Sequence, residues 1–138
     1  TGTTGDTGAP YEPRPLVLTD TVVTGNSADT GGGILSWIAL EVTGGEISDN
    51  VAVTSGGGLR AVNDPVTLTG VSVLRNTAAL GGGIALATDA TVGSVSSDWG
   101  TGADDNAPED VWTGEVAVSG YGADATFDCA ADGCAPSP

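Results

Sequence analysis

The side chains best suited to hold a metal ion gather in one stretch, SSDWGTGADDNAPEDVW, which covers residues 96–112. Calcium binds about six to eight oxygen ligands, which carboxylates and amides of a flexible loop can supply. The spacing does not match an EF-hand, whose ligands alternate along the loop and end on a Glu. The sequence therefore predicts either a calcium site or an acidic insertion at a corner of the fold. The candidate calcium ligands are Asp98, Asp104, Asp105 and Asp110, with Asn106 and Glu109 beside them.

Nucleophilic catalysis of the common kinds is excluded, because the chain contains no His. Ser–His–Asp and Cys–His arrangements both require one. A polysaccharide lyase with Arg60 or Arg75 as base and a calcium-bound acidic loop is one catalytic alternative. The usual substrates of such enzymes are anionic polymers, which a net charge of −15 would repel. A hydrolase would need a pair of carboxylates, and no spacing singles out Asp49, Asp64 or Asp89 for that role. We therefore expect a non-enzymatic protein that has no catalytic residues and no cofactor other than this candidate calcium.

The only two cysteines, Cys129 and Cys134, flank an Ala-Ala-Asp-Gly turn. Gly133 can take a positive φ there, which suits a small disulfide loop. Two cysteines without any His make a poor transition-metal site, and nothing nearby would activate a thiolate. The sequence predicts a Cys129–Cys134 disulfide, as fits an exported protein.

Trp37 and Trp112 fall at outward positions of short apolar segments. An exposed Trp can stack on a sugar or pack against a protein partner. The alternative is cover by the N-terminal arm or by the C-terminal tail, which contains Tyr121 and Phe127. We expect Trp37 and Trp112 to form interaction sites, with a protein favoured over a sugar.

Two sets of residues recur with a period in the twenties, and they define the elements that position these side chains. The first set is an apolar residue three positions before Asn or Asp, at Val23–Asn26, Ile47–Asn50, Val73–Asn76 and Val95–Asp98. The second is a glycine triplet before Ile or Leu, at residues 31–34, 56–59 and 81–84, which degenerates at 108–111. Five positions before each member of the first set stand Leu18, Val42, Leu68 and Ala90.

A repeat of this length, built of short alternating strands, predicts a β-solenoid with one repeat per rung. Alternation places Ile34, Leu59 and Ile84 in one inward column. Glycines suit the corners, because they allow unusual φ values and close backbone approach. Asparagines at a preceding corner tolerate a left-handed backbone and can stack amide on amide. The predicted ladder consists of Asn26, Asn50 and Asn76 with Gly33, Gly58 and Gly83, and Asp98 replaces the Asn in the fourth rung.

These marks, apolar-x-x-Asn followed by Gly-Gly-Gly-Ile, resemble the repeat of right-handed parallel β-helix surface proteins, including the polymorphic outer-membrane protein type of repeat. The resemblance covers about residues 16 to 115. It implies a three-faced β-helix that is exported, displayed on a bacterial surface, and used in adhesion or as structural material. We therefore expect an all-β chain with three parts. They are a Thr/Gly/Pro-rich linker or extended arm over 1–15, a right-handed parallel β-helix of about four rungs over 16–115, and a strand and loop cap over 116–138.

The charge restricts the partners, because 18 acidic residues stand against three arginines. Nucleic acid and anionic lipid surfaces would be repelled. No apolar run is long enough to span a bilayer, which predicts no transmembrane segment. The chain begins at Thr1 without Met, so we expect that an export signal has been removed. The predicted location is extracellular or at a bacterial cell surface.

Association is the function that the architecture favours. Four rungs make a rod of only about 19 Å, and each end would present unpaired N–H and C=O groups. We expect copies to stack end to end as a homo-oligomer, with the N-terminal arm crossing to a neighbour, in a surface or filament subunit. A carbohydrate-binding adhesin that recognises surface glycans is the second hypothesis. A monomer whose own tails cover its edges is the alternative to association.

Overall fold

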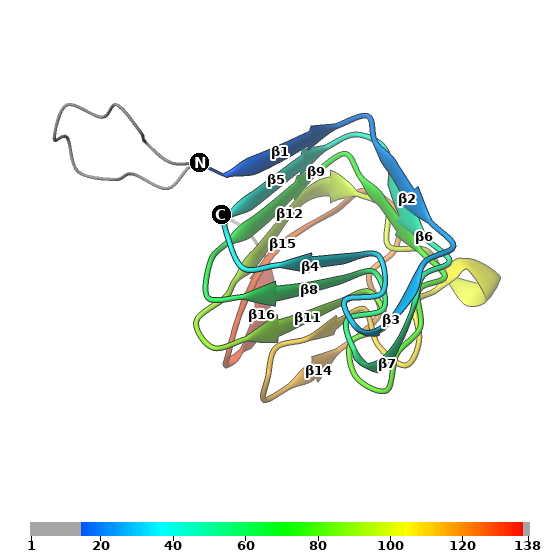
Figure 1. The fold of residues 1–138 in the computed structure, drawn as a ribbon. Helices are drawn as coiled ribbons and strands as arrows, with labels where there is room; N and C mark the ends of the chain where they lie inside the picture. Colours follow the sequence, from blue (N-terminus) through cyan, green and yellow to red (C-terminus); the bar gives the residue numbers. More distant parts are fainter. Residues whose placement is uncertain (1–14, 137–138) are drawn as a thin grey trace, which may run out of the picture.

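The structure, a computed structural model that describes residues 15–136, confirms the all-β prediction. Strand residues account for 53% of the described residues, which contain no α-helix. They wind into a β-solenoid of about four turns (Figure 1). The predicted N-terminal arm falls, apart from Pro15, outside the described residues.

Each coil contributes short strands separated by tight corners. The first coil contains β1 (Leu16–Thr19), β2 (Val22–Thr24), β3 (Ser27–Thr30) and β4 (Ile34–Ser36). The second contains β5 (Leu40–Thr43), β6 (Glu46–Ser48), β7 (Val51–Ser55) and β8 (Leu59–Val62). The third contains β9 (Val66–Thr69), β10 (Ser72–Leu74) and β11 (Ile84–Ala87), and the fourth β12 (Val92–Ser97), a 3-10 turn η1 (Gly102–Asp104) and β13 (Val111–Trp112). Three more strands follow, β14 (Ala117–Val118), β15 (Ala125–Ala130) and β16 (Gly133–Pro136).

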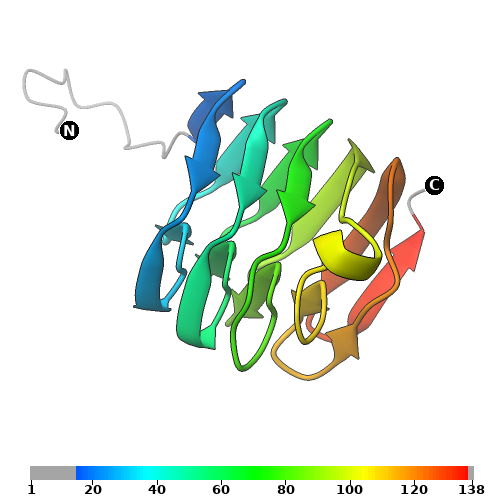
Figure 2. The same cartoon turned by 90° about the vertical axis from the view of Figure 1, so that its right-hand side faces the viewer.

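Strands at the same place in successive coils pair in parallel. β1, β5, β9 and β12 lie in one sheet, β2, β6 and β10 in a second, β4, β8, β11 and β13 in a third, and β3 pairs with β7. The register confirms the predicted inward column, because Ile34 pairs with Leu59 and Leu59 with Ile84. Figure 2 shows the coils side by side, from the blue first coil on the left to the orange and red strands of the cap on the right.

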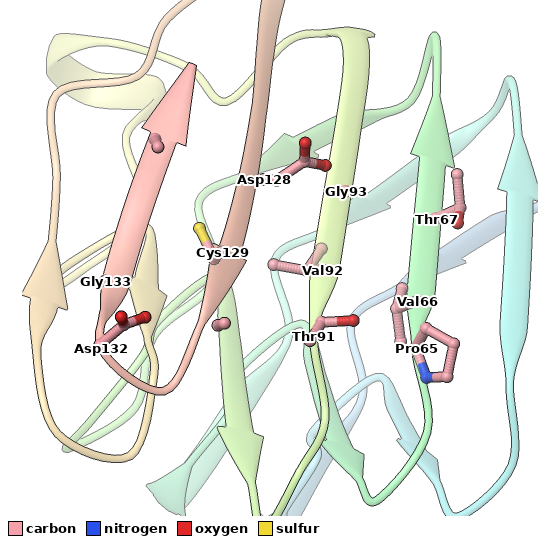
Figure 3. Close-up of a pocket in the computed structure, with 12 residues that line it drawn as sticks. Pro65, Val66, Thr67, Thr91, Val92, Gly93, Asp128, Cys129, Asp132 and Gly133 are labelled. Carbon is pink, nitrogen blue, oxygen red and sulfur yellow. The ribbon is translucent and has the colours of Figure 1, made fainter. Parts of the chain in front are cut away.

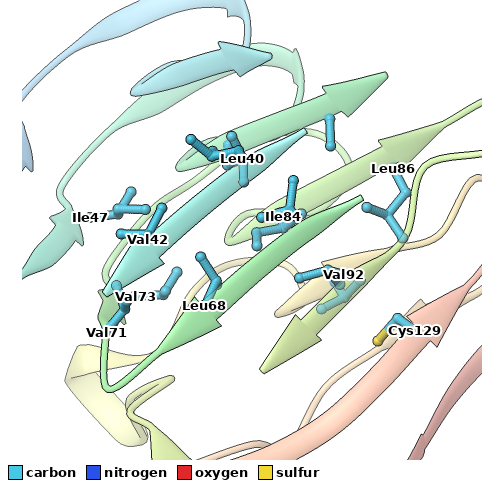
Figure 4. Packing of buried hydrophobic residues seen from close by; sticks show 14 of the residues in the cluster. Leu40, Val42, Ile47, Leu68, Val71, Val73, Ile84, Leu86, Val92 and Cys129 are labelled. Atoms are coloured by element: carbon cyan, nitrogen blue, oxygen red, sulfur yellow. The ribbon is translucent and has the colours of Figure 1, made fainter. Parts of the chain in front are cut away.

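The interior is filled by columns of aliphatic side chains (Figure 4). Alternation along each strand turns every second residue inward, as at Leu40 and Val42 of β5. Both are at most 2% exposed, and the core continues through the third and fourth coils. The inward residues of the first coil, Leu18, Val23 and Ile34, are only partly buried. The core is therefore covered from the second coil onward and incompletely covered at the first.

The corners explain the glycine triplets. The first glycines, Gly31, Gly56 and Gly81, have φ of +60, +69 and +63°, which is left-handed backbone. The second glycines have no room for a side chain. A Cβ on Gly57, for example, would lie 2.4 Å from the Thr77 carbonyl oxygen and 2.5 Å from the Gly82 carbonyl oxygen. The triplet thus serves both the turn of the chain and the close approach of successive coils.

The expectation that the ladder asparagines adopt left-handed backbone is wrong. The residue before each one does so instead, with φ of +71° at Gly25 and +54° at Asp49 and Arg75. The corner therefore lies one residue earlier, and the Asn that follows can turn its side chain into the coil.

The predicted alignment of the fourth coil is also wrong, by about four residues. Val95 lies on β12 in register with Thr69, and Ser94 rather than Ala90 pairs with Leu68. Asp98 forms a bridge with Ser72, which places Trp99 beside Val73, at the inward position predicted for Val95. The residues that follow Trp99 loop out through η1 before the coil resumes at the Thr77–Ala107 bridge. Because of these extra residues, the fourth ladder position falls later in the sequence than Asp98.

The two ends of the solenoid differ. At the C-terminal end, β14 pairs antiparallel with β13, β15 with β12, and β16 with β15. Inside this cap Trp99 and Phe127 are buried, with ring centroids 5.3 Å apart, and Tyr121 stacks on Phe127. At the other end, no described strand lies beyond β1, β2, β3 or β4. The cap closes one end of the core, and the first coil leaves the other end open.

Candidate functional sites

The asparagine ladder is a continuous line of hydrogen bonds along the solenoid. The Oδ1 atom of Asn50 accepts hydrogen bonds from the backbone N and the Nδ2 of Asn26, at 3.0 and 3.1 Å. Asn76 accepts the same pair from Asn50, at 3.1 and 3.0 Å. The third glycines, Gly33 and Gly58, cover the ladder, since a Cβ on either would lie close to the amide of Asn50 or Asn76. The ladder is thus built into the wall of the coil.

The fourth member of the ladder is Asn106. Its Oδ1 accepts from the backbone N and the Nδ2 of Asn76, at 3.1 and 3.0 Å. Asp98 could not fill this position fully, because a carboxylate accepts hydrogen bonds but cannot pass one on. Asn106 is the only Asn or Gln after residue 76. Its side-chain amide is therefore the feature of the sequence that could have identified Asn106 as the fourth ladder residue.

Asp110 ends the line of amides. Asn106 donates from Nδ2 to the Asp110 Oδ1 at 3.1 Å, and the Tyr121 backbone N donates to Oδ2 at 3.0 Å. Asp110 is 0% exposed, and burial raises its pKa to about 6 even though both hydrogen bonds favour the charged form. Burial and, to a smaller extent, Asp110 raise the pKa of Tyr121. Asp110 therefore joins the end of the ladder to the cap.

The other calcium candidates each have a separate partner. The Asp98 Oδ1 accepts from the Gly100 backbone N at 2.9 Å, and the Asp105 Oδ1 from the Asn106 backbone N at 3.0 Å. The Asp104 Oδ1 lies 2.7 Å from the Arg75 Nη1. Between residues 15 and 136, no group of three or more Asp, Glu, Cys or His side chains is arranged to hold a metal ion. The calcium site remains a prediction, without a gathered set of ligands to support it.

Glu109 is nearly buried and has a structural partner. Its Oε1 accepts a hydrogen bond from the Gly81 backbone N at 2.7 Å. In the preceding coils the equivalent Gly31 and Gly56 donate to backbone carbonyls, those of Ser55 and Leu80. The Glu109 side chain therefore substitutes for a carbonyl where the fourth coil departs from the glycine repeat.

The two arginines that could act as the base of a lyase both have polar partners. Arg75 donates from Nε and Nη2 to the two carboxylate oxygens of Asp49, at 2.9 and 3.1 Å, and from Nη1 to Asp104. These contacts raise the pKa of Arg75, and the Arg75 hydrogen bond lowers that of Asp49. Arg60 donates from Nη1 to the Ser55 hydroxyl. Arg75 links the second, third and fourth coils across a corner, as a structural ion pair would.

The three tryptophans have different surroundings. Trp99 is buried in the cap and donates from Nε1 to the Ser94 hydroxyl at 3.0 Å. Trp112 is partly buried on β13, where it pairs with Ala85 and Ala117. Trp37 follows β4 and is 61% exposed. Trp37 is therefore the tryptophan best placed to meet a partner.

The predicted disulfide joins Cys129 of β15 to Cys134 of β16, which are paired across the hairpin. Gly133 adopts a φ of +132° in the turn between them. Cys129 is 2% exposed and belongs to the core, so the disulfide fastens the outer strand of the cap to the solenoid.

A shallow groove of about 470 Å³ lies on the outer face of the sheet that β9, β12, β15 and β16 form (Figure 3). Gly93 leaves its floor low, and a Cβ there would lie 3.0 Å from the Asp128 Oδ1. Its polar lining includes Thr67, Thr91 and Asp132 as well as Asp128. These residues come from strands far apart in the sequence, so their spacing alone could not reveal the groove.

The open first coil exposes apolar side chains beside strand edges that have a partner on one side only. Six large apolar side chains there are at least 45% exposed: Leu16, Val17, Val22, Leu35, Trp37 and Ile38. Inward residues at the same register become fully covered one coil later: Leu18 is partly buried, whereas its partner Val42 is 2% exposed. An exposed sheet edge beside an incomplete core is a site for association.

Comparisons with known proteins found no matching family model, curated protein or solved structure. No helix among the described residues is long and apolar enough to cross a membrane.

Proposed function

We propose that this chain is a non-enzymatic structural protein, exported and displayed at a bacterial surface, that self-associates through an end of its solenoid. The observation that carries the proposal is the difference between the two ends. One is closed by three antiparallel strands and an aromatic cluster, and the other exposes a partly covered core. A protein that served only as a monomer would gain stability by capping both.

The proposed location rests on three observations. The repeat marks resemble those of surface-displayed parallel β-helices of the polymorphic outer-membrane protein type. The net charge of −15 suits a solvated outer surface, and the Cys129–Cys134 disulfide suits an oxidising compartment. A structural role also agrees with the use of Asn76, Asn106, Glu109 and Asp110 as internal hydrogen-bonding groups.

Light scattering coupled to size-exclusion chromatography, followed by negative-stain microscopy, tests the proposed function. We expect a mass above the 13.4 kDa of one chain, rising with concentration. A particle of one chain mass at every concentration up to the millimolar range would contradict self-association.

Carbohydrate binding is the second candidate, and the groove beside Gly93 is the observation that favours it. Hydroxyl and carboxylate groups such as Thr67 and Asp132 can bind the hydroxyls of a neutral sugar, and the groove is preformed on a rigid sheet. Glycan-array binding should then be lost in Thr67→Trp, which fills the groove. The matched control is Thr43→Trp, an exposed position outside the groove on β5 of the same sheet. Equal binding by the two variants would remove this candidate.

A further inference from the structure

The open end has hydrogen-bonding groups that lack a partner within the described chain. Leu16 and Asp20 donate from their backbone N to the second coil, at Ala39 and Thr43. Because the amide groups of a strand point alternately to its two sides, the backbone N–H groups of Val17 and Thr19 point away from the second coil. On that open side the Thr19 carbonyl accepts a hydrogen bond from the Thr21 hydroxyl. β2 and β4 likewise have a paired strand on one side only. The first coil therefore presents strand edges and apolar side chains together.

The open end carries few charged side chains. Residues 15–38 contain two charged side chains, Asp20 and Asp29, although the whole chain has 18 acidic residues. Interface cores between proteins are depleted of charge and rich in apolar and aromatic side chains. Two copies that meet through their first coils would thus avoid most of the repulsion expected from a net charge of −15.

The other end is a poor complement of the open end, because its edge strands β14 and β16 belong to an antiparallel cap. A head-to-tail stack would need free parallel strands beyond the fourth coil, but antiparallel β14 and β15 occupy the edges of β13 and β12. Residues 1–14 are a poor cover as well, because Tyr11 is their only large apolar residue and Pro10 and Pro13 have no N–H to donate. The matching surface is the first coil of a second copy.

We infer that two copies associate through their first coils across a two-fold axis and form a closed dimer. This inference rests on the proposed self-association and specifies its geometry. A two-fold axis perpendicular to the solenoid reverses the strand direction, so β1 meets β1 of the second copy antiparallel. Contact between identical surfaces closes on itself and leaves the cap of each copy at the two far ends of the dimer. The product is a short double-length rod rather than a fibre.

Sedimentation equilibrium of the full chain and of three variants tests this geometry. The wild type should reach, and not exceed, twice the chain mass of 13.4 kDa. Val17→Pro removes an N–H that points to the open end and costs no hydrogen bond to the second coil. Val22→Asp places a carboxylate on β2, at a position 62% exposed in the single chain. Each variant should weaken the dimer at least about tenfold, because Val17→Pro leaves the facing strand without a donor and Val22→Asp adds a negative charge at the contact between two acidic copies.

Val95→Asp is the matched control, since Val95 is an exposed apolar residue on the fourth coil. Its dimer should be as strong as that of the wild type. Circular dichroism of the dilute proteins separates weakened dimerisation from misfolding. If a variant has lost strand structure, cross-linking takes its place as the test. A short bis-maleimide should link two copies of Val17→Cys into a dimer and should not link two copies of Val95→Cys.

Trp37 supplies an internal reporter, because it is 61% exposed in the single chain while Trp99 is buried. Its fluorescence should shift to the blue as the wild type dimerises, and the shift should disappear in Trp37→Phe. Masses that rise beyond two chains without a limit would overturn the two-fold geometry but leave self-association standing. A wild type that stays at one chain mass would overturn both. A dimer weakened by Val95→Asp and not by Val22→Asp would place the interface elsewhere and overturn the inference.

Discussion

Asn76 carries four hydrogen bonds of the ladder in a side chain that is 0% exposed. Its Oδ1 accepts two from Asn50, and its Nδ2 donates to the Ile47 carbonyl and to Asn106. Removing this amide leaves buried donors and acceptors without partners, whereas the first member of the ladder, Asn26, is exposed and can be replaced by water.

Asn76→Ala should therefore lower the free energy of unfolding by about 3 kcal/mol or more, and Asn26→Ala by about 1 kcal/mol or less. Urea denaturation of the two variants measures the difference. Equal losses would show that the ladder does not carry the stability assigned to it.

Asp110 is a buried carboxyl whose charged form is disfavoured by burial. In the folded chain its pKa is raised to about 6 from an ordinary value of 3.8, so the folded state binds a proton at a pH where the unfolded chain has released it. The contribution of Asp110 to stability is consequently largest below pH 4 and is lost as the pH rises through 6.

Carboxyl NMR should give Asp110 a midpoint of about 6. The free energy of unfolding should rise as the pH is lowered from 7 to 5, and Asp110→Asn should reduce this slope by removing the titrating group. Relief of repulsion at a net charge of −15 acts in the same direction, so only the difference in slope between wild type and variant is assigned to Asp110. A midpoint of 4 or lower would contradict the burial of an uncompensated carboxyl.

At the scale of the elements, the glycine triplets hold the coils at strand spacing. Gly57 has no room for a methyl group between the carbonyl oxygens of Thr77 and Gly82. Gly70 also lies at a corner, with a φ of +61°, but a Cβ there would meet nothing within 4 Å. Substitutions at Gly57 and Gly70 therefore distinguish the effect of close approach between coils from the effect of a left-handed backbone.

Gly57→Ala should lower the melting temperature more than Gly70→Ala. Overpacking against backbone costs about 3 kcal/mol or more, whereas a left-handed Ala costs about 1–2 kcal/mol. Calorimetry of the two variants decides between them. A larger loss for Gly70→Ala would mean that corner geometry, not coil spacing, explains the triplets.

The first three coils could be predicted from the sequence because their marks repeat at nearly constant spacing. Ile34, Leu59 and Ile84 follow glycine triplets, and the physical requirement for Gly at a crowded corner makes these the strongest signals in the chain. The fourth coil could not be aligned in the same way. A loop between Trp99 and Asn106 changes the spacing, and Glu109 replaces the glycine corner by a side-chain hydrogen bond.

The cap and the groove were less accessible to sequence reasoning. The disulfide followed from two cysteines five residues apart, but the antiparallel pairing of β15 with β12 depends on contacts across about thirty residues. Nothing in the local pattern distinguishes a strand that continues the solenoid from one that reverses and ends it. For the same reason, the sequence predicted a strand and loop cap over 116–138 but not the antiparallel pairing of its strands with β12 and β13.

At the scale of the whole molecule, the two ends of the solenoid are built differently. The ladder runs from the exposed Asn26 to the buried Asp110, and the core is complete at the aromatic cap and incomplete at β1–β4. Six of the eleven exposed large apolar residues lie in or just after the first coil, while most carboxylates lie in the later coils and the cap. This distribution makes the first coil the place where assembly would add most to stability.

Hydrogen exchange followed coil by coil at two protein concentrations tests this central claim most directly. In dilute solution the amides of β5–β11 should exchange slowly and those of β1–β4 quickly, because the first coil is covered on one side only. At high concentration the protection of β1–β4 should rise toward that of the inner coils, while the cap strands β14–β16 stay unchanged. Strong protection of β1–β4 that is independent of concentration would contradict an open end that is closed by a second copy.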